Sequence, residues 1–415
     1  MAKISKLYAR EILDSRATPT VEAVIMLDDG AVGVSSVPSG ASTGTYEAHE
    51  LRDGDPNWYL GLGVQKAVAN VNQGIASQIV GQDIKEVREL DQKLIALDGT
   101  ATKTNLGANA ILAVSVAFTK ALAASAHQPL YKYIGQIAKI SQPFFMPSPL
   151  FNMINGGKHG AGNLDFQEFW VIPNHINSFA KALETGSVIY QNLKKLLARR
   201  GAIHSVGDEG GFAPNLFTNL DALEILNESI IQSVRKPSID VELGLDLAPN
   251  SFYKDGRYVI KDRSSPMETG EFIDYLRDLN TQYHLRLLED PLFEDDWKGW
   301  AQVTAELGNS TTIVGDDLLV TNPERVRQAI LEKSCNAILV KPNQIGTVSE
   351  TIDVVELSRS AGWKIIVSHR SGETNDTFIA DFAIGVGADY VKFGAPARGE
   401  RVAKYNRLMA IEAEL

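Results

Sequence analysis

The second half of the chain repeats one pattern, a short apolar run that ends in a polar or charged residue. Successive ends are spaced by 27, 25, 28 and 23 residues, and they are Glu289, Asp316, Lys341, His369 and Lys392. A strand followed by a returning helix needs about that much chain. Parallel strands buried on both faces form continuous apolar runs, and in a βα barrel the functional groups lie at the C-terminal strand ends. The pattern therefore predicts an α/β fold with a βα barrel whose active site lies at that end.

The first part of the chain mixes strand and helix signals. The run from Thr20 to Leu27, the turn Asp28-Asp29-Gly30 and the run from Ala31 to Val37 predict a β-hairpin. Apolar periodicity predicts helices over about 63–80 and 107–126. A meander followed by helices is typical of an α+β domain.

A cluster of prolines separates these two regions. Pro143, Pro147 and Pro149 interrupt regular structure and place a domain boundary near residue 140. We therefore expect a smaller N-terminal α+β domain over 1–140 that carries a lid loop, and a barrel over 141–415 that carries the site.

Composition limits the possible partners and compartments. The net charge is −11 and the acidic excess is spread along the chain, so a nucleic-acid surface is not indicated. One cysteine, Cys335, excludes an intramolecular disulfide and fits a reducing compartment. The start of the chain has no apolar signal region. The longest apolar stretch, over 110–126, is interrupted by polar residues. We expect that stretch to be a buried helix, and we expect no membrane association.

Three acidic residues end apolar runs and are candidates for metal ligands. They are Asp246, Glu289 and Asp316. Carboxylate oxygens suit Mg²⁺, which also binds substrate phosphate. Solvated acids at strand ends are the simpler alternative, but converging acids without a cation would repel one another. If the barrel forms, these acids predict a Mg²⁺ site.

Two lysines, Lys341 and Lys392, are expected at the same mouth. Beside a divalent cation the ammonium form is disfavoured, so the lysine pKa falls and a neutral lysine can take a proton from carbon. Both lysines could instead only bind a phosphate or carboxylate group. The sequence leaves these roles open.

The segment Ser368-His369-Arg370-Ser371-Gly372 follows one of the strand-like runs. Arginine suits bidentate recognition of phosphate, and the Ser-Gly pair offers backbone N–H groups beside it. Alone, this segment is a weak indication of a phosphate site.

A second group of polar residues lies earlier in the chain. The turn over 155–159 holds His159, Gln167-Glu168 follows, and the glycine-rich turn over 206–211 carries Glu209. An acid crowded by other acids has a raised pKa and can hold a proton at neutral pH. Glu209 and Glu168 are thus candidates for a general acid, although a salt bridge is the simpler interpretation of either one.

The loop Ser39-Gly40-Ala41-Ser42-Thr43-Gly44 has glycines but no phosphate-loop lysine. The sequence contains no dinucleotide-binding, Walker or nucleophile-elbow motif. We therefore interpret this loop as a mobile lid that carries a hydroxyl ligand.

Together these stretches resemble the enolase family, over residues 4–412. The most specific segments are 39–44, 206–211, 343–347, 368–374 and 394–404. The resemblance implies an N-terminal α+β domain, a modified TIM-like βα barrel and a homodimer or higher homo-oligomer in the cytoplasm. It also implies a glycolytic lyase that dehydrates 2-phospho-D-glycerate reversibly to phosphoenolpyruvate, with two Mg²⁺ ions, the second arriving with the substrate.

The resemblance implies a role for each site residue. Lys341 is similar to the base that removes the C2 proton, and Glu209 to the acid that helps the C3 hydroxyl leave, with Glu168 and His159 beside it. The first Mg²⁺ would be bound by Asp246, Glu289 and Asp316, and Ser42 on the lid would help bind the second. Besides Glu168 and Lys341, the implied substrate contacts are Gln167, His159, His369, Arg370, Ser371 and Lys392, with Arg370 and Ser371 on the phosphate.

Three segments depart from the family pattern: Ala17-Thr18, Leu247-Ala248-Pro249-Asn250, and Phe393. They lie near the implied dimer contact, a metal ligand and Lys392, respectively. Two alternatives stay open. Another dehydratase of the same superfamily would lack the His-Arg-Ser run and the serine-bearing lid, both of which are present. A catalytically silent enolase-like binding protein would be expected to lack Lys341, Glu209 or a metal ligand.

Overall fold

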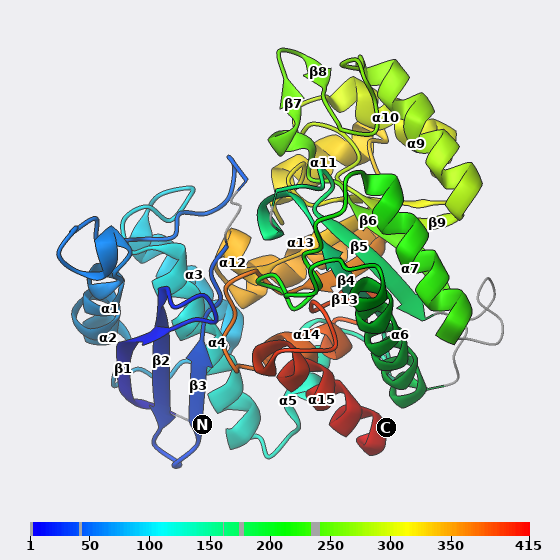
Figure 1. The fold of residues 1–415 in the computed structure, drawn as a ribbon. Coiled ribbons are helices and arrows are strands. Elements are labelled where there is room, and N and C mark those ends of the chain that lie inside the picture. Colours follow the sequence, from blue (N-terminus) through cyan, green and yellow to red (C-terminus); the bar gives the residue numbers. More distant parts are fainter. Residues whose placement is uncertain (1–2, 41–43, 161, 174–177, 234–240) are drawn as a thin grey trace.

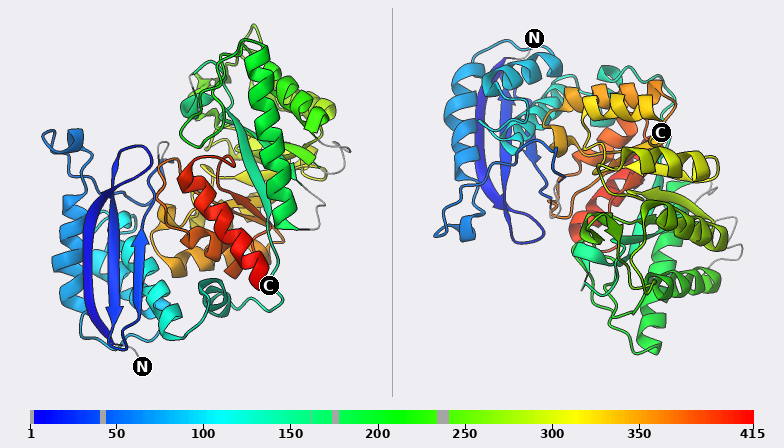
Figure 2. Two further views of the ribbon diagram at one scale, coloured as in Figure 1. Left: turned by 60° about the horizontal axis from the view of Figure 1, so that its bottom comes forward. Right: turned by 90° about the horizontal axis from the view of Figure 1, so that it is seen from above.

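A computed structural model describes residues 3–415 except 41–43, 161, 174–177 and 234–240 (Figure 1). The N-terminal part, blue and cyan in Figure 1 and Figure 2, lies beside a larger body that runs from green to red. The N-terminal part contains an antiparallel sheet of order β1-β2-β3 and a set of helices. Their bounds are β1 (Ile4–Leu13), β2 (Pro19–Leu27), β3 (Val32–Ser36), α1 (Gln65–Ala69), the π-helix η2 (Asn70–Ile75), α2 (Ala76–Ile79), α3 (Val87–Asp98), α4 (Ala108–Ser125) and α5 (Leu130–Ile137). The predicted hairpin and the predicted helix over 107–126 are confirmed as β2–β3 and α4, and the stretch over 63–80 contains α1, η2 and α2.

The larger body is a closed barrel, in strand order β10-β11-β12-β13-β4-β5-β6-β9 within the described residues. The strands are β4 (Ser148–Asn155), β5 (Glu168–Pro173), β6 (Val241–Asp246), β9 (Leu285–Glu289), β10 (Thr312–Gly315), β11 (Ala337–Val340), β12 (Lys364–Ser368) and β13 (Tyr390–Lys392). The main helices around it are α6 (Phe179–Arg199), α7 (Asn219–Ser233), α9 (Thr269–Tyr283), α10 (Trp297–Leu307), α11 (Pro323–Glu332), α13 (Val348–Ser360), α14 (Phe378–Gly385) and α15 (Gly399–Glu414), with the short α12 (Pro342–Ile345) and the small hairpin β7 (Tyr253–Lys254)–β8 (Arg257–Tyr258). The predicted α/β fold and barrel are confirmed, and the five apolar runs are β9 to β13.

One strand, β5, runs antiparallel to both of its neighbours, β4 and β6. Because of this reversal, the first residue of β5 lies at the edge where the neighbouring strands end. The register shows this directly: Asn155 pairs with Glu168, Glu168 with Asp246, and Asp246 with Glu289. Three acidic residues that are far apart in sequence are thereby placed in one row at the mouth of the barrel.

The inside of the barrel is filled by side chains from its strands. A separate buried cluster contains only strand residues, which are Leu150, Trp170, Ile172, Leu287, Val314, Ala337, Leu339, Ile366 and Tyr390. Alternate strand residues point to opposite faces, so the other buried strand residues, such as Leu288 and Val340, pack toward the helices. The barrel is therefore a packed core with its open end at the row of acids.

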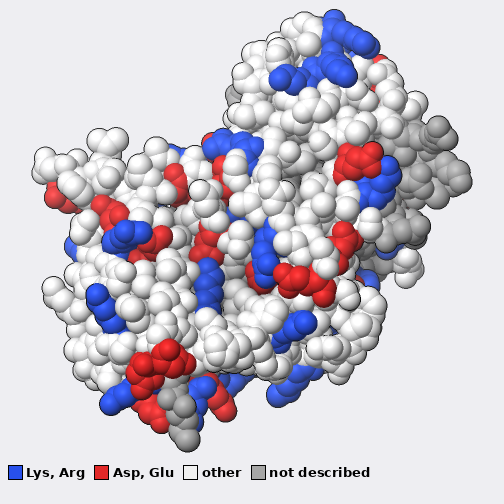
Figure 3. Space-filling view, turned by 90° about the horizontal axis from the view of Figure 1, so that it is seen from below, with Lys and Arg blue, Asp and Glu red and all other residues white. Residues whose placement is uncertain are grey.

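The predicted buried helix, α4, lies between the N-terminal sheet and the barrel, where it contacts β2, β3, α12 and α13. By length and composition alone α4 could cross a membrane, but 83% of it is buried inside the protein. Its apolar surface is therefore used in packing, as expected. On the surface of the molecule, Figure 3 shows acidic and basic side chains interspersed over the face seen from below.

Two residues of the N-terminal part bind the first turn of α13. Asp91 Oδ2 accepts a hydrogen bond from the backbone N–H of Ser349 (2.8 Å), and Ser115 Oγ accepts one from Val348 (3.0 Å). Asp91 is fully buried, and this burial raises its pKa to about 6 against the opposing effect of the hydrogen bonds from Ser115 and Ser349. The carboxylate that joins the two parts of the molecule is therefore costly to ionise.

Replacing Asp91 by asparagine is expected to change how stability depends on pH. The folded pKa of Asp91 lies above its unfolded value, so the folded state binds the proton more tightly and this contribution to stability is lost as pH rises through about 6. Between about pH 5 and about pH 8, the free energy of unfolding of Asp91→Asn should rise by roughly 1.5 kcal/mol relative to the native chain. Urea denaturation at both pH values measures it, with the exposed Asp353→Asn on α13 as the matched control. A pH-independent difference for Asp91→Asn would contradict the prediction.

Candidate active site

The mouth of the barrel is a hollow lined almost entirely by polar side chains. The structure brings most of the predicted site residues together there. These lining residues are His159, Gln167, Glu168, Glu209, Asp246, Asp316, Lys341, His369, Arg370, Ser371 and Lys392. Glu289 is buried beside Asp246 at the end of β9, and Ser42 lies outside the described residues.

Lys392 lies among the row of acids. Its Nζ is 2.8 Å from Glu289 Oε1, 3.0 Å from Asp246 Oδ2 and 3.2 Å from Glu168 Oε1, and it lies over the Trp170 ring. Trp170 Nε1 in turn donates a hydrogen bond to Glu168 Oε2 at 2.8 Å. Burial works to lower the pKa of Lys392, but the three carboxylates outweigh it and the pKa is well above its usual value. The expected fall in lysine pKa applies to a lysine beside a divalent cation, so it stays a prediction.

A second lysine, Lys341, follows β11 and forms an ion pair with Asp316 Oδ2. Asp316 Oδ1 accepts a hydrogen bond from Gln344 Nε2 at 3.1 Å, and Gln344 Oε1 accepts one from Thr321. Burial works to lower the pKa of Lys341, but the Asp316 carboxylate raises it further than burial lowers it. The expected fall in the pKa of Lys341 beside a divalent cation likewise stays a prediction.

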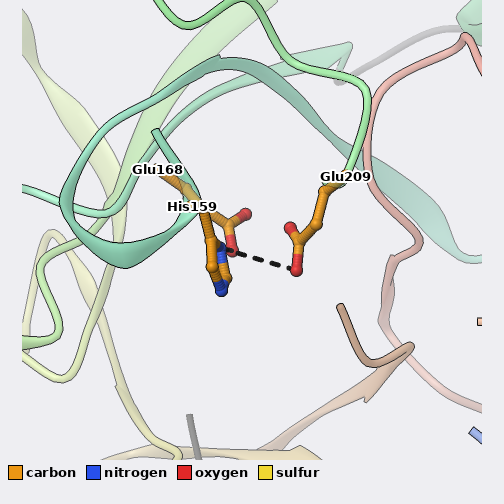
Figure 4. A group of neighbouring side chains, drawn as sticks. All are labelled: His159, Glu168 and Glu209. Carbon is orange, nitrogen blue, oxygen red and sulfur yellow. Dashed lines mark ion pairs between the residues drawn. The ribbon is translucent and has the colours of Figure 1, made fainter. Parts of the chain in front are cut away.

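On the other side of the mouth, His159 faces two carboxylates (Figure 4). Its Nδ1 is 3.4 Å from Glu168 Oε1 and 3.6 Å from Glu209 Oε1. Burial works to lower the pKa of His159, and the charges of Glu209 and Glu168 outweigh it, so the pKa is raised. The histidine is therefore favoured as a cation between two anions.

Glu209 departs from the expectation of a raised pKa. Burial does raise it, but His159, His369 and Arg401 more than offset this effect, and the pKa lies well below its usual value. Asn152 also donates a hydrogen bond to Glu209 Oε2 at 3.1 Å. The expectation is wrong because the nearest neighbours of Glu209 are cationic or hydrogen-bond donors. Glu209 is a carboxylate in this state and has to receive a proton before it can act as an acid.

A buried arginine that the sequence reasoning did not single out, Arg401, fixes the tautomer of His369. Arg401 Nη1 lies 2.6 Å from His369 Nδ1, and a guanidinium group can only donate. His369 Nδ1 is therefore the acceptor, and the ring proton is on Nε2, which faces Glu209 Oε2 at 3.4 Å. Arg401 also donates to the carbonyl oxygens of Asp208 and Arg370 and to that of Ser371. One side chain thus holds the turn of Glu209 and the segment of His369 together.

Two further residues at the mouth were not predicted as site residues. Glu47 forms an ion pair with Arg370, and Asn343 Oδ1 accepts a hydrogen bond from Arg370 Nη1 at 3.1 Å. Asn343 and Arg401 lie in segments that carried the family resemblance, so position in those motifs is the signal that could have identified them. For Glu47 the sequence offers no comparable signal.

The acids of the row suit an oxygen-seeking cation. Asp246 Oδ1 and Glu289 Oε2 are buried and have no hydrogen-bond partner. The other oxygens of these two carboxylates share the single ammonium group of Lys392 with Glu168. Burial and the neighbouring acids raise the pKa of Asp246 and hold that of Glu289 well above its usual value. Within the described residues, the groups whose possible metal-ligand atoms all lie within 4.8 Å of one another are Asp290–Asp316–Asp317 and His159–Glu168–Glu209, and not the predicted set of Asp246, Glu289 and Asp316. A divalent cation would relieve the excess negative charge in the row.

Comparison with known proteins identifies the family. The model of the enolase N-terminal domain matches residues 4–134, and that of the enolase C-terminal TIM barrel domain matches residues 143–415. The chain belongs to the enolase family. It is 50% identical to an enolase of Acidothermus cellulolyticus over 415 residues, which is all of this chain and 95% of the relative. Enolases are phosphopyruvate hydratases, so membership makes this chain a glycolytic lyase with a small-molecule substrate and implies a divalent metal ion. A match over both domains favours an enolase over another dehydratase of the superfamily.

Proposed function

We propose that the chain dehydrates 2-phospho-D-glycerate to phosphoenolpyruvate with Lys341 as the base and Glu209 as the acid. The observation that carries this proposal is their placement. Lys341 follows β11, whereas Glu209 contacts Asn152 of β4 and shares His159 with Glu168 at the start of β5. In the closed strand order β11 and β5 are on opposite sides of the barrel. A substrate between them can lose a proton from one face and a hydroxyl group from the other.

The reaction needs strong stabilisation of negative charge. A proton next to a carboxylate is a poor acid, because its removal adds charge to an anion. We propose that Asp246, Glu289 and Asp316 hold the Mg²⁺ ion, which would supply this stabilisation when bound. A lysine base beside Mg²⁺ is a general property of the enolase superfamily, and the residues here are compatible with it.

The protein's own groups set the proton positions. Lys341 can accept a proton only when Asp316 no longer holds it as an ammonium ion. His159, favoured as a cation, lies within 3.6 Å of Glu209 and is the nearest source of the proton that Glu209 needs. Hydroxyl departure would then use a proton passed from His159 to Glu209.

The finer details of ligand binding and assembly are also proposals. Arg370 and Ser371 would bind the phosphate, Gln167, His369 and Lys392 would complete the substrate contacts, and Ser42 would help bind a second Mg²⁺ that arrives with the substrate. We further propose a homodimer or higher homo-oligomer in the cytoplasm. The division into domains near residue 140 remains a prediction.

The proposal is tested by following absorbance from phosphoenolpyruvate formation in purified protein given 2-phosphoglycerate. Excess chelator is expected to reduce activity to background, because the carboxylates at the mouth then lack their cation, and added Mg²⁺ should restore it. Activity that persists in chelator would contradict the metal proposal. Absence of activity in Mg²⁺-loaded, folded protein would favour the alternative of an enolase-like binding protein.

A further inference from the structure

Glu47 lies directly on the arginine that we assign to the substrate phosphate. Its Oε2 is 2.9 Å from Arg370 Nη1, and its Oε1 is 3.2 Å from Arg370 Nη2. The side chains of the pair are 3% and 7% exposed, so the contact is largely shielded from water. A carboxylate therefore holds the two terminal nitrogens with which an arginine binds a phosphoryl group.

The segment that carries Glu47 is held against the barrel by contacts other than this pair. Ala48 N–H donates to the carbonyl oxygen of Gln344 at 2.8 Å, and Thr45 Oγ1 lies 3.1 Å from Glu294 Oε1. The Tyr46 ring stacks 3.8 Å from the Arg325 guanidinium group. The Glu47 carboxylate is thus presented to Arg370 by a segment that is anchored on both sides of it.

Hydrogen bonds also orient the Glu47 carboxylate itself. Its Oε1 accepts hydrogen bonds from Gly44 N–H at 2.9 Å and from Gln344 Nε2 at 3.3 Å. Gln344 in turn contacts Asp316, so Glu47 belongs to the same polar network as the proposed metal ligands. These contacts fix the carboxylate in the position that a phosphate oxygen would take on Arg370.

A phosphoryl group and the Glu47 carboxylate cannot both bind the two terminal nitrogens of Arg370 without weakening each other's contacts. Two anions in contact on one cation repel each other, and burial makes the repulsion stronger than it would be in water. We propose that Glu47 is an internal competitor for the anion subsite at Arg370, which the phosphoryl group must displace. This inference rests on the proposed role of Arg370. Glu47 therefore lowers the apparent affinity of this subsite for every anion by the same factor, so that only an anion with strong intrinsic binding occupies it.

The proposal predicts that removing the charge of Glu47 tightens anion binding. When the binding-competent state is only a fraction of the population, the apparent Kd is the intrinsic Kd divided by that fraction. Glu47→Gln should therefore bind inorganic phosphate about tenfold more tightly than the native chain. Isothermal titration calorimetry with inorganic phosphate, on the full chain without substrate, measures this effect.

Glu50→Gln is the matched control. Glu50 lies three residues further along the same segment and forms its ion pair with Arg52. The Glu50 charge also acts on Arg370, but Glu50 makes no hydrogen bond or ion pair with its guanidinium group, so Glu50→Gln should tighten the Kd for phosphate far less than the tenfold expected for Glu47→Gln. A Glu47→Gln variant with an unchanged or weakened Kd would show that Glu47 only anchors the segment, and would overturn the proposal.

Two more variants keep the test decisive. If Glu47→Gln does not fold, Glu47→Asp serves instead, since its shorter side chain keeps the charge but reaches Arg370 less well, and it should show a smaller gain in affinity. No gain in Glu47→Asp would then overturn the proposal. Arg370→Met separates the two hypotheses: if it binds phosphate as the native chain does, the proposed phosphate role of Arg370 fails. If Arg370→Met loses phosphate binding but Glu47→Gln shows no gain, only the competitor role fails.

Discussion

Replacing Lys341 by alanine is expected to lower kcat by roughly 10²–10⁴-fold, since a positioned general base contributes about that much to a proton transfer. Lys341 is buried at the end of β11, and its ammonium group contacts Asp316 inside the mouth of the barrel. Alanine removes the proton acceptor but leaves the opposite wall with Glu209 unchanged. Steady-state formation of phosphoenolpyruvate measures the loss, and exchange of the substrate C2 proton with deuterated solvent reports on the proton-removal step alone.

The matched control for this prediction is Lys364→Ala. Lys364 begins the neighbouring strand β12, so it lies at the other end of the barrel, where it pairs with Asp389. This variant should retain kcat within about twofold, as is usual for surface changes away from a site. A Lys341→Ala variant with kcat within tenfold of native, or with unchanged C2 exchange, would exclude Lys341 as the base.

Replacing Arg401 by methionine is expected to destabilise the folded protein by about 3–5 kcal/mol, the usual cost of breaking a buried charged network. Arg401 has no exposed surface, and it donates to three backbone carbonyl oxygens and to His369. Methionine fills much of the volume but leaves these buried acceptors without their donor. Urea denaturation at neutral pH measures the loss, and a change below about 1 kcal/mol would contradict it.

A second measurement tests the positioning of His369 separately from stability. In the native chain, ¹⁵N NMR should show the His369 proton on Nε2, because Arg401 occupies Nδ1 as a donor. Arg401→Lys keeps a donor at this position and should retain that tautomer, whereas Arg401→Met should populate both. A native His369 protonated on Nδ1 alone would refute the assignment.

The barrel strands that could be predicted are those whose burial on both faces produces a recognisable pattern in the sequence. Strands β9 to β13 are covered on both faces, so each is a continuous apolar run with a polar end, and their spacing showed the βα repeat. The antiparallel direction of β5 produces no recognisable pattern in the sequence. A strand buried on both faces has the same apolar composition in either direction, so Glu168 could be named as a site residue without knowing that it begins its strand.

Most residues that line the mouth of the barrel could be named from the sequence, but their protonation could not. The pKa of Glu209 depends on whether its neighbours are acids or histidines, and His159 and His369 reach it from distant segments. The sequence also did not show which carboxylates lie against the two lysines, and these carboxylates raise the pKa of Lys341 and of Lys392. Glu47 was missed for a related reason, because its partner Arg370 is more than 300 positions away in the sequence.

The reversal of β5 also affects how this molecule could change over evolution. The β4–β5 connection turns back at the mouth, so His159, Gln167 and Glu168 all belong to one continuous β-hairpin. Lys341, His369 and Lys392 come instead from three separate βα units. A single exchange of this hairpin could replace these three residues of the mouth together and leave Lys341, His369 and Lys392 in place. The part of the mouth that the hairpin supplies is therefore more easily exchanged as a unit by recombination than the part that comes from separate βα units.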